Sequence, residues 1–160
     1  VNELVVALCD RAARKRHEMN PQATCNTLWA LAKLQHKPDE LQTKWFFANA
    51  TYKAPNFNPQ NIANLLWAFE KLEIQPPSEL HIAVCDRISK TIHFFPPQAL
   101  AVTLHALAVV EMLPKTDVWD ALMKRTISEV RWFSGAMVCK TLTSLSIYLD
   151  LGRETENLVW

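Results

Sequence analysis

The sequence is poor in glycine, in net charge and in long apolar runs. Only two of its 160 residues are glycine and nine are proline, which argues against tight hairpins and against a glycine-rich phosphate-binding loop. The formal net charge is +1, so no excess of one sign points to a partner. No apolar stretch approaches the roughly 20 residues needed to cross a bilayer, and we expect no membrane insertion. Because 49% of the residues are hydrophobic, the chain can bury a core.

Signs of catalysis and of metal binding are also missing. The cysteines form no CxxC pair, which favours a reduced compartment, and they stand at Cys9, Cys25, Cys85 and Cys139. His81 lies four residues before Cys85, but no third or fourth metal ligand accompanies the two. We predict buried, structural roles for Cys9 and Cys85. No nucleophile, base and acid occur in a catalytic pattern, so the sequence predicts no enzyme, no metal, no cofactor and no small-molecule substrate.

What the sequence does contain is a 38-residue repeat. Four segments align without a gap, and they read MNPQATCNTLWALAKL, FNPQNIANLLWAFEKL, FPPQALAVTLHALAVV and FSGAMVCKTLTSLSIY. A leucine occupies the same column of each segment, namely Leu28, Leu66, Leu104 and Leu142. The residues between these segments repeat more loosely: the Cys-Asp-Arg at 9–11 recurs at 85–87, two periods later. Each unit therefore consists of two parts.

Both parts of the unit are predicted to be helices. The first opens with a residue suited to the first helical position, which is Pro21, Pro59, Pro97 or Gly135. Asn20, Asn58 and Ser134 precede three of these starts and are expected to cap them, whereas Pro96 has no capping side chain. A later proline or glycine is expected to end the helix and turn the chain, at Pro38, Pro76, Pro114 and Gly152.

Stacking of these helices should form the core. At about 100° per residue, the apolar residues of the second segment share one face, namely Ile62, Ala63, Leu66, Phe69 and Leu72. A two-helix unit cannot bury such a face alone, but stacked neighbours can. The predicted fold is all-α, an α-solenoid of stacked helix-turn-helix repeats with a 38-residue period.

The expected organisation is one solenoid over residues 1–160. It comprises an orphan second helix, three complete repeats and a partial repeat, at 3–17, 19–55, 57–93, 95–131 and 133–160 respectively. Because the sequence starts with Val1 and stops at Trp160 within an apolar run, we expect it to be a fragment of a longer protein.

The motifs NPQATCNTLWALAKL and NPQNIANLLWAFEKL, which begin at Asn20 and Asn58, resemble octotricopeptide repeats. The resemblance covers nearly the whole chain; it is strongest in the first two units and weakest in the fourth, where Pro-Gln and Trp are lost. It implies an α-solenoid of an organellar RNA-binding family that stabilises, processes and translates transcripts. Localisation in the mitochondrion, or alternatively in the chloroplast or another plastid, is implied in the same way.

A polar and aromatic stripe lies roughly opposite the apolar face of the first helices. Amides can read base edges, indoles can stack on bases and ammonium groups can meet phosphates. In the first two units the stripe consists of Gln22, Asn26, Trp29, Lys33, Gln60, Asn64, Trp67 and Lys71. It fades in the third and fourth units, where Gln98, His105 and Lys140 remain. We predict that this stripe binds RNA on the concave face.

Structural roles for the same residues remain open. Trp29 and Trp67 are also placed to fill space between stacked units. Lys33 and Lys71 lie near helix C-termini, where a positive charge interacts favourably with the helix dipole. Asn26 and Asn64 would then form a ladder of amide hydrogen bonds. In that interpretation the two glutamines bond to free first-turn amides.

A second candidate RNA contact is a basic cluster at the end of the first predicted helix, made of Arg11, Arg14, Lys15 and Arg16 with His17. A solvated helix end is the alternative. Arg87 and Arg125 share the register of Arg11, which predicts a basic line along the second helices.

Three functional hypotheses follow. The first is an RNA-binding solenoid whose partner is organellar mRNA or rRNA, contacted as single strands or loops. The second is a structural subunit of an organellar ribosome, most plausibly mitochondrial, or of another large assembly, holding rRNA or neighbouring proteins. The third is a protein scaffold without RNA. The near-neutral charge favours the second and third, because free RNA-binding proteins are usually more basic.

Overall fold

A computed structural model of the chain describes residues 2–157. Those residues form α-helices, with a short 3-10 turn in every second connection, and no strand occurs among them. The helices are α1 (Asn2–Arg14), α2 (Pro21–Lys33), α3 (Glu40–Lys53), α4 (Pro59–Leu72), α5 (Ser78–Thr91), α6 (Pro97–Val109), α7 (Thr116–Glu129) and α8 (Gly135–Asn157). The 3-10 turns are η1 (Arg16–Glu18), η2 (Ala54–Asn56), η3 (Ile92–Phe94) and η4 (Val130–Trp132). The predicted all-α class is confirmed.

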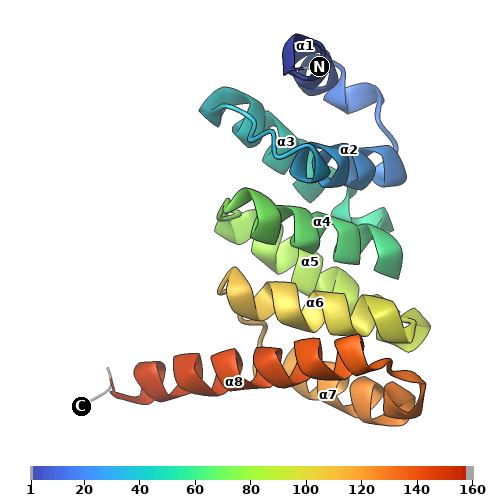
Figure 1. Cartoon of the computed structure of the whole chain (residues 1–160), viewed down its shortest axis with the longest axis vertical. Coiled ribbons are helices and arrows are strands. Elements are labelled where there is room, and N and C mark those ends of the chain that lie inside the picture. The colour runs from blue at the N-terminus through green and yellow to red at the C-terminus, as the bar shows by residue number, and fades with distance from the viewer. Residues whose placement is uncertain (1, 158–160) are drawn as a thin grey trace.

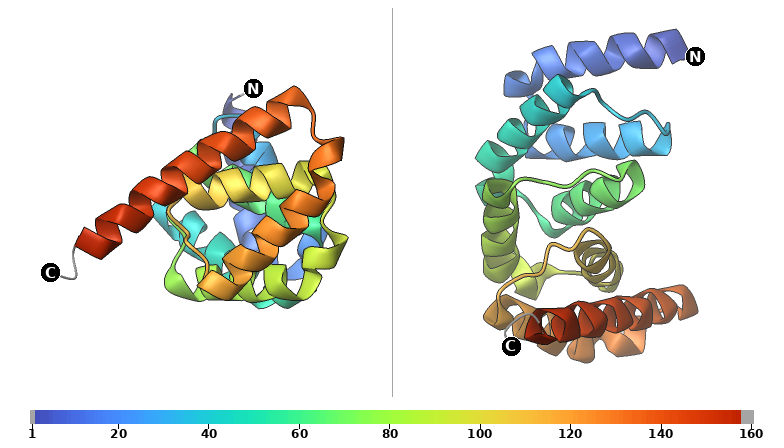
Figure 2. Two further views of the ribbon diagram at one scale, coloured as in Figure 1. Left: turned by 90° about the horizontal axis from the view of Figure 1, so that it is seen from below. Right: turned by 90° about the vertical axis from the view of Figure 1, so that its left-hand side faces the viewer.

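The helices lie in two layers (Figures 1 and 2). Helices α2, α4, α6 and α8 pack side by side in one layer, each against the next. Helices α1, α3, α5 and α7 follow one another in the second layer. Helices α1 and α8 lie at opposite ends of the stack (Figure 1). None of the helices in the described range is long and apolar enough to cross a membrane.

The predicted helix starts of the first layer are confirmed. The Asn20 side chain accepts a hydrogen bond from the amide of Ala23 at 2.7 Å. Asn58 and Asn61 form a reciprocal capping box, in which each side chain accepts from the other residue's amide. Ser134 accepts from the amide of Met137 at 3.3 Å. Helix α6 begins after Pro96 without a side-chain cap, as its sequence requires.

The predicted helix ends are partly wrong. Helices α2, α4 and α6 stop several residues before the next proline, and the chain turns through left-handed residues, at Gln35, Glu73 and Glu111. Gly152 does not end a helix, because α8 continues to Asn157. One glycine inside a helix costs only about 1 kcal/mol, and no proline follows Gly152 to stop the helix. The second helix expected after it is therefore absent within residues 2–157.

The apolar face predicted for α4 is confirmed as core. All five of its residues are buried, with exposed fractions between 0% and 5%, and burial of each large side chain stabilises the fold by about 1.5–3 kcal/mol. A buried polar contact joins the layers, since the side chain of Asn49 donates to the hydroxyl of Thr24 at 2.9 Å. The four aligned leucines differ in burial: Leu28, Leu66 and Leu104 are buried, but Leu142 is 62% exposed.

Candidate nucleic-acid interface

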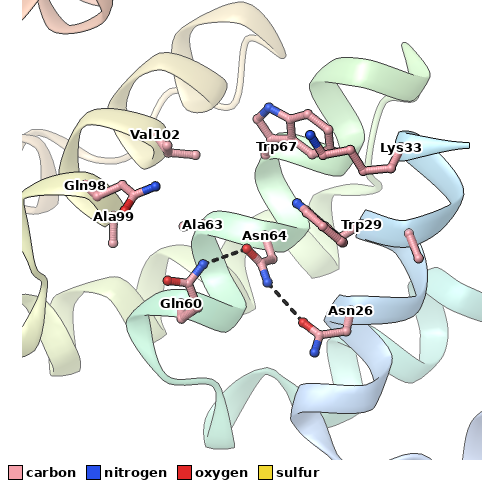
Figure 3. A pocket seen from close by; sticks show the side chains of 11 residues that line it. Asn26, Trp29, Lys33, Gln60, Ala63, Asn64, Trp67, Gln98, Ala99 and Val102 are labelled. Carbon is pink, nitrogen blue, oxygen red and sulfur yellow. Dashed lines mark hydrogen bonds between the residues drawn. The ribbon is translucent and has the colours of Figure 1, made fainter. Parts of the chain in front are cut away.

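A groove of about 670 Å³ crosses the first layer over helices α2, α4 and α6 (Figure 3). Its polar and aromatic lining residues are Asn26, Trp29, Lys33, Gln60, Asn64, Trp67 and Gln98. The remaining lining consists of Ala30, Ala63, Ala99 and Val102, whose small side chains leave the space open. No carboxylate lines the groove. Six of the eight stripe residues predicted in the first two units, together with Gln98 of the third, therefore line one groove.

Three amide side chains form a continuous hydrogen-bonded chain across α2 and α4 (Figure 3). Gln60 Nε2 donates to Asn64 Oδ1 at 2.7 Å, and Asn64 Nδ2 donates to Asn26 Oδ1 at 3.0 Å. The hydrogen bond predicted between the side-chain amides of Asn26 and Asn64 is thus confirmed. Gln60 bonds to Asn64 rather than to a first-turn amide, so that part of the structural alternative is wrong. The hydrogen-bonded chain uses the Gln60 NH₂ group and the Asn26 oxygen, so the Gln60 oxygen remains an acceptor and the Asn26 NH₂ group a donor for other partners.

The two indoles and one lysine form the other wall of the groove (Figure 3). The ring centroids of Trp29 and Trp67 are 6.1 Å apart, with an angle of 42° between the planes. The Lys33 ammonium lies 5.5 Å from the Trp29 centroid and 5.0 Å from the Trp67 centroid, within the range of cation–π attraction. Trp29 is 38% exposed, while Trp67 is partly buried and packs against the core. Trp67 therefore does fill space between helices, and Trp29 keeps a ring face available.

Four residues of the predicted stripe lie outside the groove lining. Gln22 is exposed at the start of α2, and His105 and Lys140 belong to the α6–α8 contact. Lys71 turns to Glu70, its Nζ lying 2.7 Å from the carboxylate. The physical reason is the extra carboxylate, because the position equivalent to Glu70 in the first unit is Ala32.

Glu70 and His105 form a partly buried polar contact that spacing did not reveal. The Glu70 side chain is 7% exposed and lies 3.9 Å from His105 Nε2. Burial and the nearby Lys140 ammonium lower the pKa of His105 below its ordinary value of 6.5, and they outweigh the opposing attraction of Glu70. His105 is therefore neutral at pH 7, as expected for a residue between helices rather than a base.

This shift predicts a loss of stability in acid. The folded state disfavours protonated His105. The stability that the neutral imidazole contributes to the fold is therefore complete above pH 6.5, and it is lost as the pH falls below that value. Urea denaturation of the wild type and of His105→Gln, compared at about pH 7.5 and 5.5, should show a larger loss for the wild type. Equal losses in the two proteins would contradict the assignment.

The basic cluster at the end of α1 is mostly engaged within the chain. Arg14 pairs with Asp10 at 3.0 Å, and Lys15 pairs with Glu18. Arg16 donates to the carbonyl of Ala13 at 2.9 Å, and its guanidinium lies over the Trp45 ring at 4.8 Å. Arg11 remains exposed. These contacts are those of a paired, largely exposed helix end, and the phosphate contact at this cluster stays a prediction.

Two members of the predicted basic line along the second layer are engaged by backbone carbonyls, and Arg125 also pairs with Glu129 at 2.8 Å. Arg87 Nε donates to the carbonyl of Phe57 at 2.6 Å, and Arg125 donates to the carbonyl of Phe95 at 3.3 Å. Both carbonyls lie just before a first-layer helix, and both arginines belong to second-layer helices. These hydrogen bonds therefore connect the two layers. The common Cys-Asp-Arg motif marked Arg87 as a repeated residue, but spacing alone did not identify its acceptor.

The cysteines divide into buried and exposed. Burial raises the pKa of Cys9 to about 11 and that of Cys85 to about 12, and it raises the pKa of Cys25 as well. The predicted core roles of Cys9 and Cys85 are confirmed, whereas Cys139 is exposed. Among residues 2–157 no group of three or more His, Cys, Asp or Glu side chains is arranged to hold a metal.

A family model described as Tbc2 translation factor, N-terminal domain, matches residues 1–158. No curated protein sequence matches the chain.

Proposed function

The chain belongs to the family of the Tbc2 translation factor N-terminal domain, and from this premise we propose that it serves translation by binding RNA. The family name supports a role in translation, and the groove over α2, α4 and α6 supplies a surface with the chemistry for RNA. The proposed role is binding rather than catalysis. The proposed site of action is an organelle, the mitochondrion or alternatively the plastid, as the octotricopeptide resemblance implies.

We propose that the architecture is an α-solenoid of 38-residue units of the octotricopeptide type. Helices α2, α4, α6 and α8 begin at positions 21, 59, 97 and 135, and the four 3-10 turns begin at positions 16, 54, 92 and 130. Both series have the same constant interval. The left-handed residues at the helix ends keep this spacing too, at Gln35, Glu73 and Glu111. Repetition of a helix start, a 3-10 turn and a left-handed turn supports stacked copies of one supersecondary unit.

The observation that carries the RNA proposal is the Trp29–Lys33–Trp67 cluster in a groove without carboxylates. An incoming base stacks on the exposed face of Trp29. Cation–π attraction holds Lys33 beside the rings, and no carboxylate pairs with it within residues 2–157, so its ammonium can turn to a phosphate. The free atoms of the amide chain, on Asn26 and Gln60, and the side chain of Gln98 are then within reach of base edges.

A structural role in an organellar ribosome or another large assembly is the second candidate. It is favoured by the net charge of +1 and by the hydrogen bonds that already engage Asn26 and Asn64. In that role the groove holds a fixed rRNA segment or a protein neighbour, and affinity for free RNA is weak.

Salt titration tests the RNA proposal. Binding of a labelled single-stranded RNA of roughly 20 nucleotides should weaken linearly on a log–log plot against salt, with a slope of about −0.7 for each phosphate contacted. Lys33→Gln should reduce that slope by about 0.7, because one phosphate contact is removed. Lys90→Gln is the matched control, since Lys90 is an exposed lysine on α5 in the other layer. Binding that neither salt nor Lys33→Gln changes would contradict the proposal.

A further inference from the structure

A second pocket, of about 750 Å³, lies in the second layer between α3 and α5. Its size is within the range of ligand-binding pockets, roughly 300–1,000 Å³. Its lining includes Lys44, Phe47, Ala48 and Tyr52 of α3, Pro77 just before α5, and Glu79 of α5. In this layer α1 precedes α3 and α7 follows α5 (Figure 2). The pocket is therefore built in the middle of the stack, and not at either end.

Aromatic and apolar side chains form most of the pocket wall. Phe47 packs against the core, and its ring meets the Phe69 ring edge-on with the centroids 5.6 Å apart. Tyr52 is 77% exposed, and the Lys53 ammonium, which is outside the lining, lies 5.1 Å from its ring centroid. The Phe47 ring is thus fixed by its neighbours, whereas the Tyr52 ring offers open apolar surface beside it.

The apolar character of this pocket is peculiar to one unit of the stack. The comparison uses the 38-residue units proposed above. Ala48, Tyr52 and Pro77 correspond to Asp10, Arg14 and Asp39 in the preceding unit, and to Asp86, Lys90 and Lys115 in the following one. Since charged residues occupy these positions on both sides, the stack does not need apolar side chains there. Exposed apolar surface that folding does not require is typical of an interaction site.

Two charged side chains line the pocket, and only one of them is neutralised. Lys44 Nζ lies 2.6 Å from the Glu40 carboxylate. Glu79 pairs with no cation among residues 2–157. A free carboxylate in an apolar pocket repels the phosphates of a nucleic acid. It attracts a cationic side chain that stands beside an apolar one, as occurs in protein segments.

We propose that the α3–α5 pocket binds a segment of another protein in which a large apolar side chain stands next to an arginine or lysine. The apolar side chain enters between Phe47, Tyr52 and Pro77, and its cationic neighbour pairs with Glu79. Ile82, one turn after Glu79 on α5 and 60% exposed, extends the apolar surface on the same side of that helix. The RNA groove is lined by first-layer helices, so the two sites share no residue.

Selection of random phage-displayed peptides of about 12 residues tests the proposal, with the wild type and Tyr52→Lys as parallel targets. Tyr52→Lys should fold, because Lys90 occupies the equivalent exposed position in α5. We expect the wild type, but not Tyr52→Lys, to enrich peptides that combine Trp, Phe or Leu with Arg or Lys. Ile127→Lys is the matched control and should enrich the same peptides as the wild type, because Ile127 is 73% exposed on α7 and lies outside the pocket.

The most enriched peptide, synthesised with a fluorescent label, then measures the affinity of the pocket. Glu79→Gln should weaken its binding by about threefold, the effect of one exposed ion pair, and Trp29→Ala in the RNA groove should leave it unchanged. The proposal is overturned if no peptide is enriched, if the enriched peptides lack basic residues, or if Tyr52→Lys retains the affinity. Displacement of the peptide by single-stranded RNA, or self-association of the wild type that Tyr52→Lys abolishes, would assign the pocket to another occupant and would also overturn it.

Discussion

Replacing Trp29 and Trp67 together by alanine is expected to lower the affinity for single-stranded RNA by about two orders of magnitude or more. Each base stacked on an aromatic side chain contributes about 1–3 kcal/mol, which corresponds to roughly a tenfold to hundredfold change in affinity. The double change also releases Lys33, whose ammonium lies about equally near both rings. Fluorescence anisotropy with the labelled RNA measures the loss directly.

Two further variants keep this prediction interpretable. Trp67 packs against the core, so its removal costs some stability, whereas Trp29→Ala alone removes an indole that is 38% exposed. The single variant should keep the wild-type circular dichroism and still lose about tenfold in affinity. Trp132→Ala is the control, because this exposed indole lies in η4, away from the groove. If Trp29→Ala and Trp132→Ala bind equally well, the groove is not the stacking surface.

The net charge of the chain is a poor guide to the groove. A value of +1 averages the whole surface, on which Glu70 neutralises Lys71 and Asp10 neutralises Arg14. The groove lining itself holds Lys33 and no carboxylate. A nucleic acid responds to the local potential within about 8–10 Å at ordinary salt, so a near-neutral protein can still present a favourable RNA surface.

Much of the fold could be predicted because its signals are local. The proline at position 21 and the asparagine at position 58 specify helix starts through one residue's own geometry and hydrogen bonds, and both predictions are confirmed. The prediction that a helix ends at Gly152 is wrong, because α8 continues to Asn157 and a glycine by itself is a weaker signal than a capping side chain. A glycine permits a helix to end but does not require it, and whether the chain turns there depends on a helix available to pack against it.

The candidate site was predictable as a surface but not as a set of contacts. Helical spacing brought Trp29, Asn64 and Gln98 to one groove. It did not show that Lys71 turns to Glu70, nor that Arg87 reaches the Phe57 carbonyl. A partner on the same helix or on another element changes the direction of a long side chain, and the spacing of residues along one helix contains no information about that partner.

The aligned leucines provide a stability test of the stacking itself. Leu66→Ala removes a fully buried side chain and should lower the free energy of unfolding by about 2–5 kcal/mol, because it removes apolar contacts and leaves a cavity. Leu142→Ala makes the same chemical change at the equivalent position, where the side chain is 62% exposed, and should change stability by no more than about 0.5 kcal/mol. Urea denaturation monitored by circular dichroism measures both values. Similar losses for the two variants would contradict the stacking, because they would mean that the burial of this leucine in α4 and its exposure in α8 make no difference to stability.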